Sequence, residues 1–150
     1  MSLKTTIDND IKKAMLARNK EELEALRSIK SMILLAETEK GVTAAISQET
    51  EGKLLMKAAK QRKESAEIFQ KEGRQDLAQR ENFQLDVINR YLPAQMSESE
   101  ITDAVKGIIT TVGAKGLQDM GKVMGTATKA LAGKADGRII SEIVKKLLAA

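Results

Sequence analysis

Apolar residues recur at helical spacing along almost the whole chain, and this periodicity constrains the fold more than any other feature of the sequence. Residues 139–148, for example, carry isoleucine, valine and leucine three and four positions apart, which places them on one face of a helix. One proline, Pro93, interrupts the pattern, and three residues are aromatic (Phe69, Phe83 and Tyr91). β-Proteins usually contain more aromatic, β-branched and turn residues. The sequence therefore predicts an all-α fold.

Pro93 also marks the clearest boundary in the chain. Proline lacks an amide proton and disfavours helical geometry in the residue before it, so the preceding helix must end near Leu92. We therefore expect an N-terminal lobe of helical hairpins, with about four helices, over residues 1–93. A small three-helix tail module is expected over residues 97–150. Because so small a module is marginal by itself, it should pack on the first lobe or on a partner.

Capping residues divide the two lobes into individual helices. Asn19, Ser47 and Ser97 are suited to cap the helices that follow them, because their side-chain oxygens accept hydrogen bonds from unpaired amides. Glu22 lies three residues after Asn19, and Glu100 three residues after Ser97, which is the spacing of a capping box. The expected helices cover approximately residues 7–18, 19–41, 48–72, 74–92, 98–112, 118–132 and 137–149.

The chain contains no histidine and no cysteine. Disulfides, thiolate and imidazole metal sites, Ser–His and Cys–His nucleophiles and imidazole acid–base catalysis are therefore excluded. Carboxylate pairs such as Glu64 and Glu67 have no obvious apolar surroundings, so we interpret them as parts of solvated helix faces. We expect no catalytic residue, no metal and no cofactor.

The hydropathy pattern addresses the location of the chain. No apolar run reaches the roughly 18 residues needed to cross a bilayer, and the charged sequence after Met1 contains no apolar segment typical of a secretory signal. By elimination we expect no membrane partner and a cytoplasmic location. The formal net charge of +4 permits an anionic partner without requiring one, and it does not specify an oligomeric state.

Residues 116–123 match the spacing G-x-x-x-x-G-K of a phosphate-binding loop. Val123, however, occupies the position of the magnesium-ligating serine or threonine, and a helical rather than a strand pattern precedes the match. We interpret these residues as the glycine-containing start of a helix. Gly121 and Gly125 lie within that helix, where each glycine costs about 1 kcal/mol relative to alanine. Close approach of another backbone, from a neighbouring helix or from a nucleic acid, would explain them.

The densest basic stretch lies in the third expected helix. Lys57, Lys60 and Lys63 could contact phosphates or simply face solvent, and the region lacks interleaved aromatic residues on which bases would stack. Arg27 and Arg62 each fall close to an otherwise apolar stripe. We therefore predict that an arginine pairs with a glutamate at the hairpin interface, with Glu81 as the candidate.

Several short blocks follow one another in a characteristic order. They are Lys57-x-x-Lys60-Gln61-Arg62-x-Glu64, Gly73-Arg74-x-Asp76-Leu77, Glu81, Tyr91-Leu92-Pro93-x-Gln95, Met120-Gly121-Lys122-Val123-Met124 and Gly133-Lys134-Ala135-Asp136-Gly137. In this order they resemble the GatB/YqeY family over essentially the whole chain. The family is similar to the C-terminal helical and tail domains of GatB, a subunit of the glutamine-dependent amidotransferase that converts Glu-tRNA(Gln) or Asp-tRNA(Asn). In that enzyme the tail domain contacts tRNA.

The resemblance implies a non-catalytic tRNA- or RNA-binding module with a role in translation. The chain has no room for the kinase-like catalytic core of GatB and no amidase sequence, so carbon–nitrogen ligase activity with glutamine as amido donor would be at most an inherited family label. The alternative is a protein-interaction adaptor that docks on an amidotransferase or an aminoacyl-tRNA synthetase. The candidate RNA-binding residues are Lys115, Lys122, Lys129, Lys134 and Arg138, with Lys57, Lys60 and Lys63 as a secondary basic face. Helix N-termini near Gln118 and Gly137 would add amide donors for a phosphate.

Overall fold

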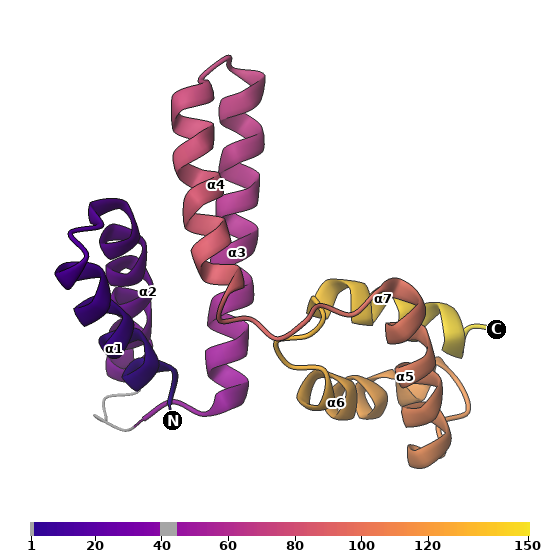
Figure 1. The fold of residues 1–150 in the computed structure, drawn as a ribbon. Coiled ribbons are helices and arrows are strands. Elements are labelled where there is room, and N and C mark those ends of the chain that lie inside the picture. The colour runs from indigo at the N-terminus through magenta and orange to yellow at the C-terminus, as the bar shows by residue number, and fades with distance from the viewer. Residues whose placement is uncertain (1, 40–44) are drawn as a thin grey trace. The chain divides into compact units, whose positions relative to one another are not determined.

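The computed structural model describes residues 2–39 and 45–150. Within these ranges the chain forms seven α-helices and one short 3-10 helix and contains no strand (Figure 1), which confirms the all-α prediction. The helices are α1 (Leu3–Leu16), α2 (Lys20–Glu39), α3 (Gln48–Lys71), α4 (Gln75–Asn89), α5 (Glu98–Val112), η1 (Leu117–Asp119), α6 (Met120–Ala130) and α7 (Gly137–Leu148). They form two compact units, Met1–Leu92 and Pro93–Ala150, which we call the first unit and the tail unit. No helix in the described ranges is both long enough and apolar enough to cross a membrane.

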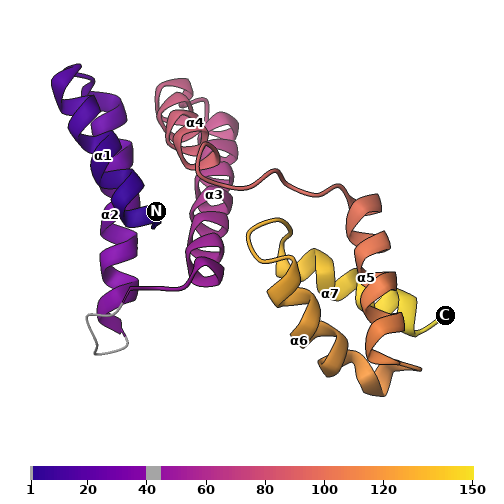
Figure 2. The same cartoon turned by 60° about the horizontal axis from the view of Figure 1, so that its bottom comes forward.

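The first unit consists of two helical hairpins, α1–α2 and α3–α4 (Figures 1 and 2). Apolar residues three and four positions apart give α2 a single buried face, because this spacing follows the turn of the helix. The fully buried large side chains of the unit are Ile7, Leu26, Ile29, Ile33 and Val87. Burying each side chain of this size contributes about 1.5–3 kcal/mol, so these contacts hold the hairpins together.

Short turns close both hairpins. Asn19 caps α2, because its Oδ1 accepts a hydrogen bond from the Glu22 amide at 3.2 Å. The Glu22 carboxylate accepts in return from Asn19 Nδ2 at 3.1 Å, so the predicted partnership is confirmed, although through the side chain of Asn19. Between α3 and α4, Gly73 has a left-handed φ of 74°, which glycine adopts at least cost. The predicted end of the second helix at Gly41 lies outside the described residues.

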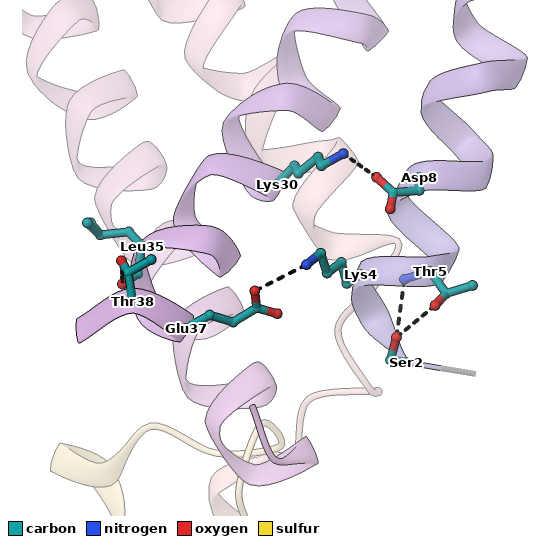
Figure 3. Close-up of polar contacts among 8 residues, drawn as sticks. All are labelled: Ser2, Lys4, Thr5, Asp8, Lys30, Leu35, Glu37 and Thr38. Carbon is teal, nitrogen blue, oxygen red and sulfur yellow. Dashed lines mark hydrogen bonds and ion pairs between the residues drawn. The ribbon is translucent and has the colours of Figure 1, made fainter. Parts of the chain in front are cut away.

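Ion pairs connect α1 to α2 on the surface of the first unit (Figure 3). Lys4 Nζ lies 3.1 Å from Glu37 Oε2, and Lys30 Nζ lies 2.6 Å from Asp8 Oδ1. Lys4 and Asp8 belong to α1, whereas Lys30 and Glu37 belong to α2. Each helix therefore supplies the cation of one pair and the anion of the other.

Partly buried polar contacts fix α4 to the rest of the first unit. Arg62 Nη1 on α3 lies 3.0 Å from Glu81 Oε2 on α4, which confirms the predicted pair for Arg62. Arg27 is exposed and forms no ion pair within the described residues. The Tyr91 hydroxyl, just after α4, donates a hydrogen bond to Asp10 Oδ2 on α1. Burial raises the pKa of Tyr91 above its ordinary value, and the hydrogen bond to Asp10 raises it further.

The tail unit packs α5, α6 and α7 around a core of its own. Its most deeply buried side chains are Ile101, Val105, Val123, Ile140 and Val144. The predicted capping box is confirmed: Ser97 Oγ accepts from the Glu100 amide at 3.2 Å, and Glu100 Oε1 accepts from the Ser97 amide at 3.1 Å. The hydrogen bond from the Ser97 amide lowers the pKa of Glu100.

The phosphate-loop-like spacing at residues 116–123 has a structural explanation. Helix α5 precedes it, and Gly116 leads into η1 and then α6, so it is the start of a helix as predicted. The single helix expected over residues 118–132 is divided into η1 and α6. Val123 is fully buried in the tail core, which accounts for an apolar residue where a nucleotide site would need a hydroxyl.

Candidate functional site

Helix α6 has one face in the core of the tail unit and the opposite face in solvent. Val123 and Ala127 are fully buried, whereas Lys122, Thr126 and Lys129 are exposed. Lys122 and Lys129 are seven residues apart, so they lie on the same side of the helix, about 10 Å from each other along its axis. The helix contains no aspartate or glutamate, and neither lysine forms an ion pair within the described part of the chain. We call this exposed, positively charged surface the α6 face; it consists of Gly121, Lys122, Gly125, Thr126 and Lys129.

The two glycines of the α6 face have no contact that requires a glycine. A Cβ atom added to Gly121 or Gly125 would meet no other described atom within 4 Å. The prediction that a neighbouring helix approaches them is therefore wrong for the described chain. Since a glycine in the interior of a helix costs about 1 kcal/mol, contacts within the molecule do not account for Gly125. Gly121 lies in the first turn of α6, where the cost is smaller. Approach by a nucleic-acid backbone stays a prediction.

The loop between α6 and α7 is fastened to the segment that begins the tail unit. Gln95 Nε2 donates to the Gly133 carbonyl oxygen at 2.7 Å, and the Met96 amide donates to the Lys134 carbonyl oxygen at 2.9 Å. Gly133 is buried and has a φ of 76°, whereas the Lys134 side chain is exposed. Two blocks of the family pattern thus meet in space. Gln95 belongs to one of the family blocks, but its contact with Gly133 could not be predicted from the sequence. A partner 38 residues away leaves no local signal.

The five candidate residues of the tail unit are all exposed, but they do not form one cluster. Lys122 and Lys129 share the α6 face. Lys115 lies in the loop before η1, at the N-terminal side of α6. Lys134 and Arg138 follow the C-terminal end of α6, in the loop and in the first turn of α7. The candidates therefore extend from one end of α6 to the other.

The helix starts near Gln118 and Gly137, which are predicted to add amide donors to a phosphate, each lie beside an aspartate. At the start of α7, Asp136 Oδ1 accepts a hydrogen bond from the Arg138 amide at 2.9 Å. Near Gln118, Asp119 Oδ2 accepts from the Lys115 amide at 2.9 Å. Each carboxylate places a negative charge where the helix dipole would favour an anion. These carboxylates therefore oppose the approach of a phosphate, and the amide contribution stays a prediction.

The secondary basic face lies on α3 in the first unit. Lys57, Lys60 and Lys63 are exposed and are spread over about a third of the circumference of the helix. Arg62 is directed elsewhere, because Glu81 binds its guanidinium. Lys57 and Lys63 thus point about 120° apart around α3, whereas Lys122 and Lys129 are only about 20° apart around α6.

A hollow of about 500 Å³ lies in the first unit between α2, α3 and α4. Ile29 and Ile88 form part of its wall, together with the uncharged polar side chains of Gln61, Ser65 and Gln84. Across residues 2–39 and 45–150, no group of three or more histidine, cysteine, aspartate or glutamate side chains is placed to hold a metal ion. Arg62 and Glu64 also line the hollow, and the Arg62 guanidinium is bound by Glu81.

The fold and this surface define an all-helical protein of two compact units, one of which exposes an acid-free cationic helix face. The chain belongs to the YqeY family, since residues 4–148 match the family described as Yqey-like protein. The family predicted from the sequence blocks is thereby confirmed.

Two relatives of the chain are fungal proteins named "Altered inheritance of mitochondria protein 41, mitochondrial". The relative from Pyrenophora tritici-repentis is 32% identical over 146 residues, which cover 94% of this chain and 78% of the relative. The relative from Clavispora lusitaniae is 33% identical over 113 residues, which cover 74% of this chain and 65% of the relative. Both relatives therefore extend beyond the region they share with this chain.

The names of these relatives overturn the expectation of a cytoplasmic location. Both relatives are named as mitochondrial proteins, which contradicts that expectation. The expectation rested on elimination alone. It used no residue that distinguishes the cytoplasm from a mitochondrial compartment, so it could not separate the two.

Proposed function

We propose that this protein is a non-catalytic RNA-binding module that contacts tRNA through its tail unit. The observation that supports this best is the α6 face, where Lys122 and Lys129 are exposed on one side of a helix without acidic residues. Lys115, Lys134 and Arg138 extend the cationic surface beyond both ends of the helix. Lys57, Lys60 and Lys63 on the first unit make a secondary contribution.

The chemistry of the surface favours phosphate contacts over reading of bases. Lysines that neutralise phosphates release condensed counterions, so the affinity falls steeply as salt rises. Folded RNA is bound largely through shape and through its phosphates and 2′-hydroxyls. The aromatic residues of the chain, Phe69, Phe83 and Tyr91, all precede the tail unit, so base stacking is not expected there.

The glycines of the α6 face support the same proposal. Gly121 and Gly125 leave the helix backbone uncovered, with no described atom of the protein packed against it. A nucleic-acid backbone can come closer to such a surface than to one covered by side chains. The choice of tRNA rests on the family's similarity to the tail region of GatB. Amide transfer is not proposed, because the chain contains no histidine or cysteine to supply a nucleophile–base pair.

Filter binding of total tRNA to the purified chain, repeated over a range of salt, tests this function. We expect tight binding at low salt, and we expect the double variant Lys122→Ala/Lys129→Ala to lower the slope of log affinity against log salt by about 2, one for each lost phosphate contact. The control Lys106→Ala/Lys145→Ala removes two exposed lysines of the tail unit outside the α6 face. The control and the test variant therefore have the same net charge. Its slope should remain close to that of the unchanged chain.

The absence of binding at low salt would contradict the proposal. The competing proposal is an adaptor that docks on an amidotransferase or an aminoacyl-tRNA synthetase. Co-purification of the chain with such an enzyme, free of RNA and insensitive to both double variants, would favour it.

A further inference from the structure

The segment Pro93–Met96 holds the α6–α7 loop by specific hydrogen bonds. The carboxamide of Gln95 donates to two carbonyl oxygens, of Gly133 at 2.7 Å and of Pro93 at 3.0 Å. A glutamine amide has two protons to donate, and this side chain uses both: one joins the two segments through Gly133, and the other holds the side chain to its own segment through Pro93. The next residue, Met96, adds the hydrogen bond from its amide to the Lys134 carbonyl oxygen at 2.9 Å.

These contacts fix the backbone on both sides of Lys134. Its amide donates to the Leu131 carbonyl oxygen at 3.0 Å, and its own carbonyl oxygen accepts from Met96. The residue before it, Gly133, has a φ of 76°, a conformation in which a side chain would be strained. The Lys134 side chain is exposed. Hydrogen bonds therefore hold the backbone of Lys134 in place while its ammonium group faces solvent.

We propose that Gln95 is a positioning residue for RNA binding, which holds Lys134 in the orientation used to contact a phosphate. The inference rests on the proposed function of the tail unit. Without the Gln95 donors, the Gly133 carbonyl oxygen loses its partner and the loop gains conformations. Binding must then restrict these conformations, and the entropy lost in doing so weakens the complex.

Gln95 is well suited to this role because it lies outside the core of the tail unit. That core is formed by apolar side chains of α5, α6, α7 and the loop after α6, and Gln95 itself is largely exposed. Its replacement should therefore leave the tail unit folded. Gln95→Met retains the length of the side chain and removes both donors, so it isolates the hydrogen bonds.

A double-mutant cycle with the full chain and total tRNA tests the proposal. We expect Gln95→Met to weaken binding about fivefold, the loss typical of ordering one further group on association. In the Lys134→Ala background the same change should have almost no effect, because the side chain that Gln95 positions is gone. In the Lys122→Ala background, which alters the far end of α6, the fivefold loss should persist in full.

Amide hydrogen exchange of the RNA-free protein provides a second readout. The Lys134 and Ala135 amides, which both donate to Leu131, should exchange faster in Gln95→Met, while amides of α5 remain protected. Equal losses in the Lys134→Ala and Lys122→Ala backgrounds, or unchanged exchange in the loop, would overturn the positioning role even if the chain binds tRNA. A failure of the proposed function itself would look different, since the unchanged chain would then bind no tRNA at low salt.

Discussion

The first unit and the tail unit carry the same net charge of +2, with 17 basic and 15 acidic residues in one and 8 and 6 in the other. They use these charges differently. In the first unit, several cations pair with anions of another helix, as in Lys4–Glu37 and Arg62–Glu81. In the tail unit, Lys122 and Lys129 form no ion pair within the described part of the chain. Net charge alone therefore does not distinguish the two units as RNA-binding surfaces, whereas the acid-free helix α6 does.

The pair with the greatest expected effect on stability is Arg62–Glu81. The two side chains are only 31% and 19% exposed, so Arg62→Met would leave a half-buried carboxylate without its partner. We expect a loss of about 1–2 kcal/mol in the free energy of unfolding of the first unit, measured by urea denaturation. Arg138→Met in the tail unit is the control. Arg138 is 79% exposed and lies 3.8 Å from Glu142, so its removal should cost less than about 0.5 kcal/mol. Equal losses in both variants would remove the contrast between the units.

Tyr91 provides a pH-dependent test of the first unit. Tyr91→Phe removes the hydrogen bond to Asp10 and should cost about 1 kcal/mol near neutral pH. Because burial raises the pKa of Tyr91 in the fold, its contribution should be complete below the ordinary value of 10.0 and should decline as the pH rises above it. Tyr91 is the only tyrosine, so the difference in stability between the two proteins isolates this group. A difference that stays constant up to pH 11 would contradict this interpretation.

The capping box of the tail unit should have the smallest effect. Glu100→Ala removes the acceptor for the Ser97 amide, so the melting temperature of the tail unit should fall slightly at neutral pH. The pKa of Glu100 is lowered in the fold, so its contribution should be present above the ordinary value of 4.5 and lost as the pH falls below it. Wild type and variant should then melt alike in acid. A difference in melting temperature that persists at pH 2 would mean that the negative charge of Glu100 is not the source of its stabilising effect.

Features that depend on neighbouring residues in the sequence could be predicted. The capping box of Ser97 and Glu100 follows from a three-residue spacing, and the all-α fold follows from apolar periodicity. The Arg62–Glu81 pair could be predicted because the two helices of a hairpin are adjacent in the chain and Arg62 interrupts an apolar stripe.

Features that depend on distant residues could not be predicted. The hydrogen bond between Gln95 and Gly133 joins residues 38 positions apart, and neither periodicity nor composition encodes it. The surroundings of Gly121 and Gly125 also required the structure, because a glycine spacing fits a packed interface and an open surface equally well. The cytoplasmic location failed for another reason: it relied on the absence of signals rather than on any residue.

The central proposal is that the exposed lysines of the α6 face carry most of the RNA binding, whereas Lys57, Lys60 and Lys63 of the first unit make only a secondary contribution. The most direct test compares the salt dependence of tRNA binding for two variants that each lose two exposed lysines, Lys122→Ala/Lys129→Ala in the tail unit and Lys57→Ala/Lys63→Ala in the first unit. We predict that the tail variant lowers the slope of log affinity against log salt by about 2 and that the first-unit variant lowers it by less than about 1. Equal decreases in the two variants would contradict the claim, because attraction by net charge alone would then explain the binding.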